Sequence, residues 1–285
     1  SSGEKVEAST ALIVTSQDYL ISRIRTTLGK NIKPDYFFIK RDENVKVQRR
    51  QELRADSLKR YGLNPLWIDD YTEITNILEE VEIRFLRNNI FISGSAENYG
   101  DFGHDRAIEF LYELGLVISE NSNKILTGFG HGVGSAVING VLNNMEHERN
   151  QDIDNYLIMR PFPQFSNKEI EIKELWTNYR KKFISLAGIE VIVFGNRKNK
   201  ETGEIERSIG MYEEFEISLD KGLKIVPVGA TGFVARDIWE RVINEFEKYY
   251  PDHINLKKDF LILGDIKNSN ATILKSIISI INTLN

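Results

Sequence analysis

The chain of 285 residues is long enough for one large domain or two of ordinary size, and its 41% hydrophobic and 28% charged residues are typical of globular proteins. A net charge of −5 disfavours binding to nucleic acid or to an anionic membrane, and the absence of cysteine excludes disulfides and thiolate metal sites. No apolar stretch approaches the roughly 18 residues of a membrane span, so we expect a cytoplasmic protein. Residues 1–9, beginning Ser1-Ser2-Gly3, are interpreted as a tag scar and leader and carry no fold prediction.

Residues 10–86 alternate between strand and helix patterns. Apolar runs predict strands at 11–15, 35–40 and Asn64–Ile68, and helical patterns lie between and after them at 19–28, 45–61 and 71–85. The last of these helices has apolar residues at helical spacing, namely Ile74, Ile77, Leu78 and Val81. A parallel α/β unit of about 75 residues is marginal alone, so we interpret it as part of a larger domain.

Residues 88–285 continue the alternation and form the second predicted domain. The strands are expected at 89–92, Lys124–Thr127, 155–159, 191–194, 224–228 and 260–263, and the helices at 103–113, 133–143, 171–184, 211–219, 234–249 and 271–284. Residues 196–208 are polar and predict a mobile loop. This order implies a doubly wound parallel sheet with helices on both faces, whose ligand site lies beyond the carboxyl ends of the strands.

Two glycine-rich segments about thirty residues apart follow predicted strands at that edge. The first contains Gly94 and Ser95, and the second has four glycines in seven residues: Gly128, Gly130, Gly132 and Gly134. Glycines between a strand and a helix allow backbone N–H groups to approach a phosphate, so we predict a nucleotide with more than one anionic group. The alternative is close packing of helix against strand. His131 within the second segment is a lone histidine, and we predict no metal site.

Charged residues near the same edge are candidates for holding the rest of a nucleotide. Arg160 follows a strand that we expect to be central, where it suits bidentate phosphate binding, and either Arg180 or Lys181 is expected to turn inward from its helix. Glu213 or Glu214, near the start of the next helix, is expected to bind the ribose hydroxyls. The alternative for Arg160 is a surface ion pair, and for Arg180 and Lys181 it is a solvated helix face. For Glu213 and Glu214 the alternative is a favourable interaction with the helix dipole.

The second domain resembles the SLOG superfamily, the Rossmann-like fold of the LOG enzymes and DprA. The residues that carry the resemblance are Phe91 to Ser95, Gly128 to Ala136, and Gly210-Met211-Tyr212-Glu213-Glu214, with Arg160-Pro161-Phe162-Pro163 and Gly195-Asn196 in addition. Residues 10–86 resemble the C-terminal part of a Sir2-like NAD⁺-hydrolase domain, through Tyr36 to Ile39, Gln51 to Arg54 and Tyr61-Gly62-Leu63. A Sir2-like domain followed by SLOG, here 10–86 and 88–285, is the order found in ThsA-like effectors of the Thoeris anti-phage system.

This resemblance implies a regulatory role. In ThsA-like proteins the SLOG domain binds a cyclic ADP-ribose isomer made by a TIR-domain partner, which reorganises a tetramer and activates NAD⁺ hydrolysis. Applied to this sequence, the resemblance implies that the cyclic ADP-ribose isomer is held by Arg160, by Arg180 or Lys181, and by Glu214. The glycine segments would line its diphosphate. We expect a homo-oligomer, either dimer or tetramer, with no cofactor in this chain. The Sir2-type catalytic Asn and His are not found before residue 86, so we expect this chain itself to lack hydrolase activity.

The alternative is a LOG-type nucleoside 5′-monophosphate phosphoribohydrolase, in which Glu214 would stabilise an oxocarbenium-like transition state. LOG enzymes have Pro-Gly-Gly before Gly-Thr-x-x-Glu, whereas this chain has Arg207-Ser208-Ile209 before Gly210 and Met211 in place of the threonine. These differences favour the role of a cyclic-nucleotide sensor over that of a LOG-type enzyme. A DNA-binding role like that of DprA is disfavoured by the acidic charge balance.

Overall fold

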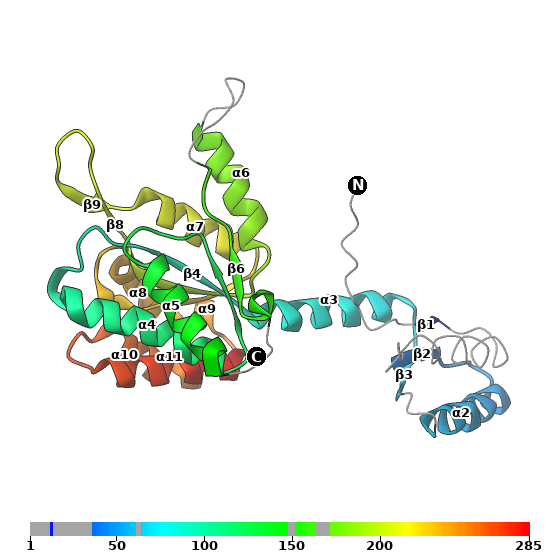
Figure 1. Ribbon diagram of the computed structural model, residues 1–285. Coiled ribbons are helices and arrows are strands. Elements are labelled where there is room, and N and C mark those ends of the chain that lie inside the picture. The colour runs from blue at the N-terminus through cyan, green and yellow to red at the C-terminus, as the bar shows by residue number, and fades with distance from the viewer. Residues whose placement is uncertain (1–11, 14–35, 61–63, 148–151, 164–171) are drawn as a thin grey trace. The chain divides into compact units, whose positions relative to one another are not determined.

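A computed structural model describes residues 12–13, 36–60, 64–147, 152–163 and 172–285. The chain divides into two compact units, Ser1–Glu82 and Ile83–Asn285. Each unit has a parallel sheet of its own (Figure 1). None of the helices in these ranges is long and apolar enough to cross a membrane.

The first unit has a three-stranded parallel sheet in the order β1-β2-β3, formed by Leu12–Ile13, Tyr36–Lys40 and Asn64–Ile68. Helix α2 (Val45–Lys59) follows β2, and the Asn44 side chain caps it by accepting from the backbone N–H of Lys46. These elements confirm the strand at 35–40, the strand Asn64–Ile68 and the helix at 45–61. The predicted helix at 19–28 lies outside the described residues, as does most of the strand at 11–15.

The second unit is built on a five-stranded parallel sheet in the order β10-β7-β4-β5-β6. The strands are β4 (Asn89–Ser95), β5 (Lys124–Thr127), β6 (Leu157–Met159), β7 (Ile189–Phe194) and β10 (Lys224–Pro227). Every residue of β7 is buried, as expected for a strand covered by helices on both faces. The fold is therefore the predicted α/β class with a doubly wound parallel sheet.

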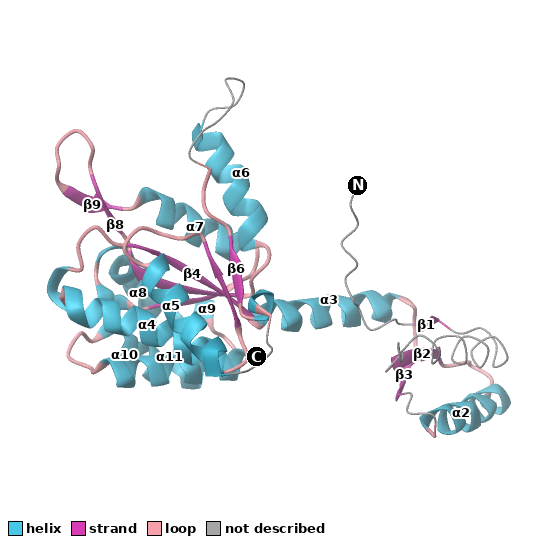
Figure 2. Cartoon of the chain, viewed as in Figure 1, coloured by secondary structure: helices cyan, strands magenta, loops and turns pink. Residues whose placement is uncertain are grey.

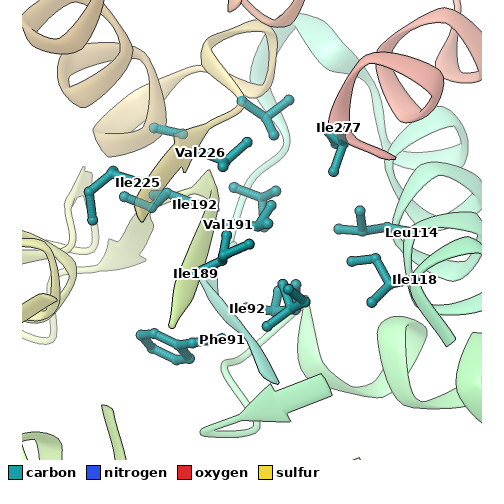
Figure 3. Packing of buried hydrophobic residues seen from close by; sticks show 14 of the residues in the cluster. Phe91, Ile92, Leu114, Ile118, Ile189, Val191, Ile192, Ile225, Val226 and Ile277 are labelled. Atoms are coloured by element: carbon teal, nitrogen blue, oxygen red, sulfur yellow. The ribbon is translucent and has the colours of Figure 1, made fainter. Parts of the chain in front are cut away.

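Helices cover both faces of this sheet (Figure 2). On one face lie α4 (His104–Glu120) and α5 (Gly134–His147), with α11 (Asn270–Leu284) packed against α4. On the other lie α6 (Ile172–Ile184) and α7 (Ile209–Asp220). Figure 3 shows Leu114 and Ile118 of α4 and Ile277 of α11 gathered on one side of the sheet. Phe91 points to the opposite side, where its ring meets that of Phe183 in α6 edge to face, 5.0 Å between centroids.

Apolar spacing explains why α4 and α11 pack on the sheet. In α4 the buried residues Ala107, Phe110, Leu111, Leu114 and Ile118 recur every three or four positions, and α11 repeats the pattern with Ile273, Leu274, Ile277, Ile280, Ile281 and Leu284. Ser269 begins α11 by accepting a hydrogen bond from the backbone N–H of Thr272. Helix α3 (Thr72–Arg87) leads into the sheet at β4, and α8 (Phe233–Asn244) follows β10.

Three predicted elements are wrong. The strand predicted at 260–263 lies inside helix α10 (Lys257–Gly264), where Phe260 and Leu263 are buried three residues apart on one helical face. The loop predicted at 196–208 contains an antiparallel hairpin of β8 (Asn196–Lys198) and β9 (Ile205–Arg207). The helix predicted at 234–249 is two helices, because the backbone leaves helical geometry at Glu245 before α9 (Phe246–Tyr249).

Candidate functional site

The strand order places a topological switch point between β4 and β7. These neighbouring strands end at Ser95 and Phe194, and the helices that follow them, α4 and α7, leave to opposite faces of the sheet. Opposite departures leave a crevice at the carboxyl ends, which is where doubly wound folds bind ligands. The edge predicted from sequence is thus the edge that the topology selects.

The two glycine-rich segments pack directly against each other at this edge. A Cβ atom at Gly130 would lie 1.9 Å from the carbonyl oxygen of Gly94, and one at Gly132 would lie 2.0 Å from that of Ala96. The backbone N–H of Ala96 donates to the carbonyl of His131 at 2.8 Å. Close packing within the chain therefore accounts for Gly130 and Gly132, since any side chain would displace the facing backbone. Their contact with a ligand stays a prediction.

The other glycines of the prediction are also confined. A Cβ at Gly94 would lie 2.7 Å from a methyl group of Val193, one at Gly128 would lie 2.8 Å from the Phe162 ring, and one at Gly134 would lie 2.8 Å from the Cα atom of Phe129. Phe129 itself has a left-handed backbone (φ 58°) and is 53% exposed. The segment thus presents an aromatic ring to solvent beside the switch point.

A hollow of about 530 Å³ opens between the first glycine segment and the β8–β9 hairpin. Its lining includes Ser95, His131 and the basic residues Arg197, Lys198 and Lys200. His131 lies 3.1 Å from the carboxylate of Glu97, which also lines the hollow. Ser95 is therefore a predicted site residue that faces open space of nucleotide size.

Arg180 is the cation that turns inward from α6. Its guanidinium contacts the carboxylates of both Glu213, at 2.8 Å, and Glu214, at 3.2 Å. It also lies over the ring of Phe162, 4.8 Å from the centroid. Thr177 donates to the other oxygen of Glu213. The structure thus brings Arg180, Glu213 and Glu214 together, with 11% of the Arg180 side chain exposed.

This ion-pair cluster adjoins the glycine segments. Ser93, one residue before Gly94, donates from Oγ to Glu214 at 2.7 Å. A Cβ at Gly210 would lie 2.5 Å from a terminal nitrogen of Arg180. Arg180 therefore lies over the first turn of α7, at the same edge of the sheet as Ser93 and Gly94.

Two predicted cations are not part of this cluster. Lys181, next to Arg180 on α6, is exposed. Arg160 follows β6, which is an edge strand rather than the central one expected, and its guanidinium is exposed and donates to the carbonyl of Met159 at 3.1 Å. The expected central strand before Arg160 is therefore wrong, and the contact of Arg160 with a ligand stays a prediction.

Glu190 is a buried carboxyl group that the sequence reasoning missed. Burial, followed by the charge of Glu214, raises the pKa of Glu190 to about 8, while the nearby Ser93 and Ser218 hydroxyls act in the opposite direction. Burial also raises the pKa of Glu214, opposed by Arg180 and Ser93. The signal available in the sequence was one acidic residue inside the apolar run Ile189–Phe194.

Asn196 is a second residue that the prediction did not single out for the site. Its side-chain oxygen accepts from the backbone N–H groups of Glu97, at 3.0 Å, and Asn98, at 2.9 Å, and its amide donates to the carbonyl of Asn98 at 2.7 Å. Ser95 donates to the Asn196 carbonyl at 3.1 Å. Asn196 therefore fixes the loop after β4 to the start of the hairpin.

The far strand of the hairpin is fixed to α8. Arg207 forms an ion pair with Asp237, and the Tyr212 hydroxyl donates to the same carboxylate at 2.5 Å. Burial, together with Asp237, raises the pKa of Tyr212 to about 12, so this hydroxyl stays a donor across the physiological range. Both strands of the hairpin are therefore anchored at its base, where Asn196 pairs with Arg207.

Comparison with known proteins places these features in a family. The family model of the Sir2- and TIR-associating SLOG proteins, STALD, matches residues 73–284. The chain belongs to the STALD family. That match covers the whole parallel sheet of the second unit, the glycine segments and the Arg180 cluster.

Curated relatives extend the similarity over nearly the whole chain. The chain is 37% identical over 284 residues to the NAD(+) hydrolase ThsA of Cytobacillus dafuensis, and 35% identical over 277 residues to that of Bacillus cereus (strain MSX-D12). These alignments cover 94% of this chain, but 57% and 56% of the respective relatives. A third, from Acinetobacter baumannii (strain 532279), is 35% identical over 82% of this chain and 52% of its own length. The STALD chain therefore spans little more than half the length of these relatives.

Proposed function

We propose that this STALD chain is the sensor region of an anti-phage Thoeris effector that depletes NAD⁺. Its second unit binds a cyclic ADP-ribose isomer of the 3′ type, supplied by a TIR-domain protein. Binding activates an attached Sir2-like NAD⁺ hydrolase within a homo-oligomer, a dimer or tetramer, in the cytoplasm. The relatives named NAD(+) hydrolase ThsA and the family description support the link to Sir2 and TIR proteins.

The observation that carries the ligand proposal is the inward-facing Arg180 beside the switch point. A buried guanidinium in a water-poor setting is a strong partner for a diphosphate, because charge-assisted bidentate hydrogen bonds weaken little by screening there. Glu213 lies next to it, is one-third exposed and has an oxygen suited to ribose hydroxyls. Ser95 and the 530 Å³ hollow supply further polar groups at the same edge, because the lining of the hollow combines Arg197, Lys198 and Lys200 with Glu97, Glu201 and Glu206.

Binding measurements on two neighbouring variants test this proposal. Arg180→Ala is expected to weaken affinity for 3′-cyclic ADP-ribose by at least about 30-fold, corresponding to roughly 2 kcal/mol for a lost buried charge contact. Lys181→Ala is the matched control, since it removes an exposed cation one residue away, and it should change affinity by less than about twofold. Equal losses in both variants would contradict the proposed contact.

The LOG-type phosphoribohydrolase remains the second candidate because Glu214 is a buried acid with a raised pKa, as glycosidic cleavage requires of an acid. Against it, both Glu214 oxygens are already bonded, one to Ser93 and one to Arg180. Release of adenine from AMP that disappears in Glu214→Gln would establish this enzyme. No adenine release across common nucleoside monophosphates would exclude it.

A further inference from the structure

Four polar side chains form a cluster inside the apolar core between the sheet and α7. Glu190 comes from β7, Ser93 from β4, and Glu214 and Ser218 from α7. All four are buried, and Glu190 and Ser218 are fully inaccessible to solvent. Burying a carboxyl group among apolar side chains is costly unless it has a partner or carries a proton, so this cluster requires an explanation.

Strand register and helix spacing bring the four together. Glu190 pairs with Phe91 and Ser93 pairs with Ile192, so Glu190 and Ser93 project from neighbouring strands to the same face of the sheet. Phe91 meets α6 on that face. Glu214 and Ser218 are one helical turn apart, and both turn from α7 toward the sheet.

Glu190 is the member with the weakest hydrogen bonding, because the nearby Ser93 and Ser218 hydroxyls act on its pKa without meeting it at full hydrogen-bond geometry. Ser93 donates to Glu214, and Glu214 accepts from Arg180, but neither oxygen of Glu190 nor the hydroxyl of Ser218 has a hydrogen-bond partner. Ser93 gives its one proton to Glu214, so Glu190 can bond to Ser93 only by donating, which requires a protonated carboxyl group. The geometry therefore suits a neutral Glu190 better than an ionised one.

The charged groups around Glu190 come from one side. Glu214 on α7 acts on it directly, and Glu213 and Arg180 lie beyond Glu214. The residues paired with Glu190 on the adjoining strands are apolar, Phe91 on β4 and Ile225 on β10. No cation among the described residues contacts Glu190 within ion-pair distance, so its charge could be balanced only by a proton.

We propose that Glu190 is a positioning residue that holds a proton, supports Ser93 and Glu214 behind Arg180, and couples ligand binding at Arg180 to uptake of a proton. The coupling rests on the proposed function, because it requires an anionic ligand at Arg180. The raised pKa of Glu190, about 8, agrees with a neutral carboxyl group at physiological pH. Above that pH, Glu190 ionises beside Glu214, and two like charges in the core oppose the arrangement that Ser93 maintains.

The direction of the linkage follows from electrostatics. An anion bound at Arg180 competes with Glu214 for the guanidinium and adds negative charge near Glu190. Ionisation of Glu190 therefore becomes harder in the bound state. A group whose pKa is higher in the complex takes up a proton on binding over the interval between its free and bound values. Affinity is therefore expected to fall as pH rises above about 8, by up to tenfold for each pH unit.

The experiment compares the unmodified protein with Glu190→Gln and Ser218→Ala. Carbon-13 labelling of glutamate carboxyl groups gives the titration of Glu190 in the free protein, assigned by the signal that Glu190→Gln removes. Affinity for 3′-cyclic ADP-ribose is then measured calorimetrically from pH 6.5 to 9.5. The diphosphate of 3′-cyclic ADP-ribose has no group that titrates in this range.

We expect the Glu190 signal to titrate near pH 8 and the Glu214 signal to shift with it. Affinity of the unmodified protein and of Ser218→Ala should fall at least about tenfold from pH 7 to 9.5, and that of Glu190→Gln by less than about twofold. Parallel pH profiles in all three proteins, or a Glu190 signal titrating near pH 4.5, would overturn the inference. If no cyclic isomer binds but Glu190 titrates near pH 8 and the Glu214 signal shifts in the same transition, the proposed ligand is wrong and the positioning role of Glu190 stands.

Discussion

Replacing Glu190 by Gln should make the protein more stable at neutral and alkaline pH. The carboxyl group has a pKa of about 8 in the folded protein, against 4.5 for an ordinary glutamate. Between these values the folded state keeps a proton that the unfolded chain has released. Unfolding therefore releases a proton, and stability must decline as pH rises through this interval.

The magnitude follows from the width of that interval. Each pH unit between the two values lowers the free energy of unfolding by about 1.4 kcal/mol. Compared with its value below pH 4.5, the free energy of unfolding is therefore lower by about 3 kcal/mol at pH 7 and by about 5 kcal/mol above pH 8. The full favourable contribution of Glu190 is present below pH 4.5 and is lost as pH rises through 8. For a domain of marginal stability this is a large fraction of the total.

Urea unfolding of both proteins at pH 5, 6, 7, 8 and 9 measures this difference. Glutamine has nearly the same shape and needs no proton, so titrating groups away from Glu190 cancel in the comparison, and the difference reports Glu190 together with its neighbour Glu214. The Gln variant should gain on the unmodified protein steadily from pH 5 to 8 and then level off. A difference that stays constant with pH would show instead that Glu190 is already ionised in the folded state at these pH values.

Three further substitutions test the site. Arg180→Ala leaves two carboxylates without their cation and should lower the free energy of unfolding in urea by about 3–5 kcal/mol. Adding Glu214→Gln should recover most of this loss, and no recovery would show that Arg180 and Glu214 are not coupled. Gly130→Ala places a Cβ 1.9 Å from a facing carbonyl oxygen and should cost more than about 3 kcal/mol, against less than about 0.5 for the exposed Ser135→Ala on the following turn. Asn196→Ala leaves three backbone groups unpaired and should accelerate amide hydrogen exchange after β4 by at least about tenfold; unchanged exchange there would contradict its role as an anchor.

The alternation of strand and helix patterns was enough to predict the sheet, because parallel strands buried on both faces are continuous apolar runs. Short runs remained ambiguous: 260–263 was predicted as a strand, but Phe260 and Leu263 are three apart and pack from a helix. Pattern alone cannot distinguish the two at that length. The hairpin at 196–208 was missed because its polar side chains bury little apolar area and leave no periodic signal.

The candidate site was likewise predicted in part from the sequence and in part not. The sequence placed the glycine segments at the correct edge, but it could not show that the glycines face each other's backbone, because that depends on how two distant segments meet. It left Arg180 and Lys181 as alternatives, and only the packing of α6 against α7 selects Arg180 as the inward residue. Glu190 was excluded when its strand was taken to begin at Val191, since a charged residue is not expected in a buried strand.

Calorimetric titration of this STALD chain with 3′-cyclic ADP-ribose, alongside 2′-cyclic ADP-ribose and AMP, distinguishes a cyclic-nucleotide sensor from a phosphoribohydrolase. Tight binding of one cyclic isomer, with a matching rise in melting temperature, is the result that the sensor account predicts. Absence of heat and of any thermal shift with both cyclic isomers would contradict it. Binding of AMP alone, followed by slow release of adenine, would instead assign the protein to the phosphoribohydrolases.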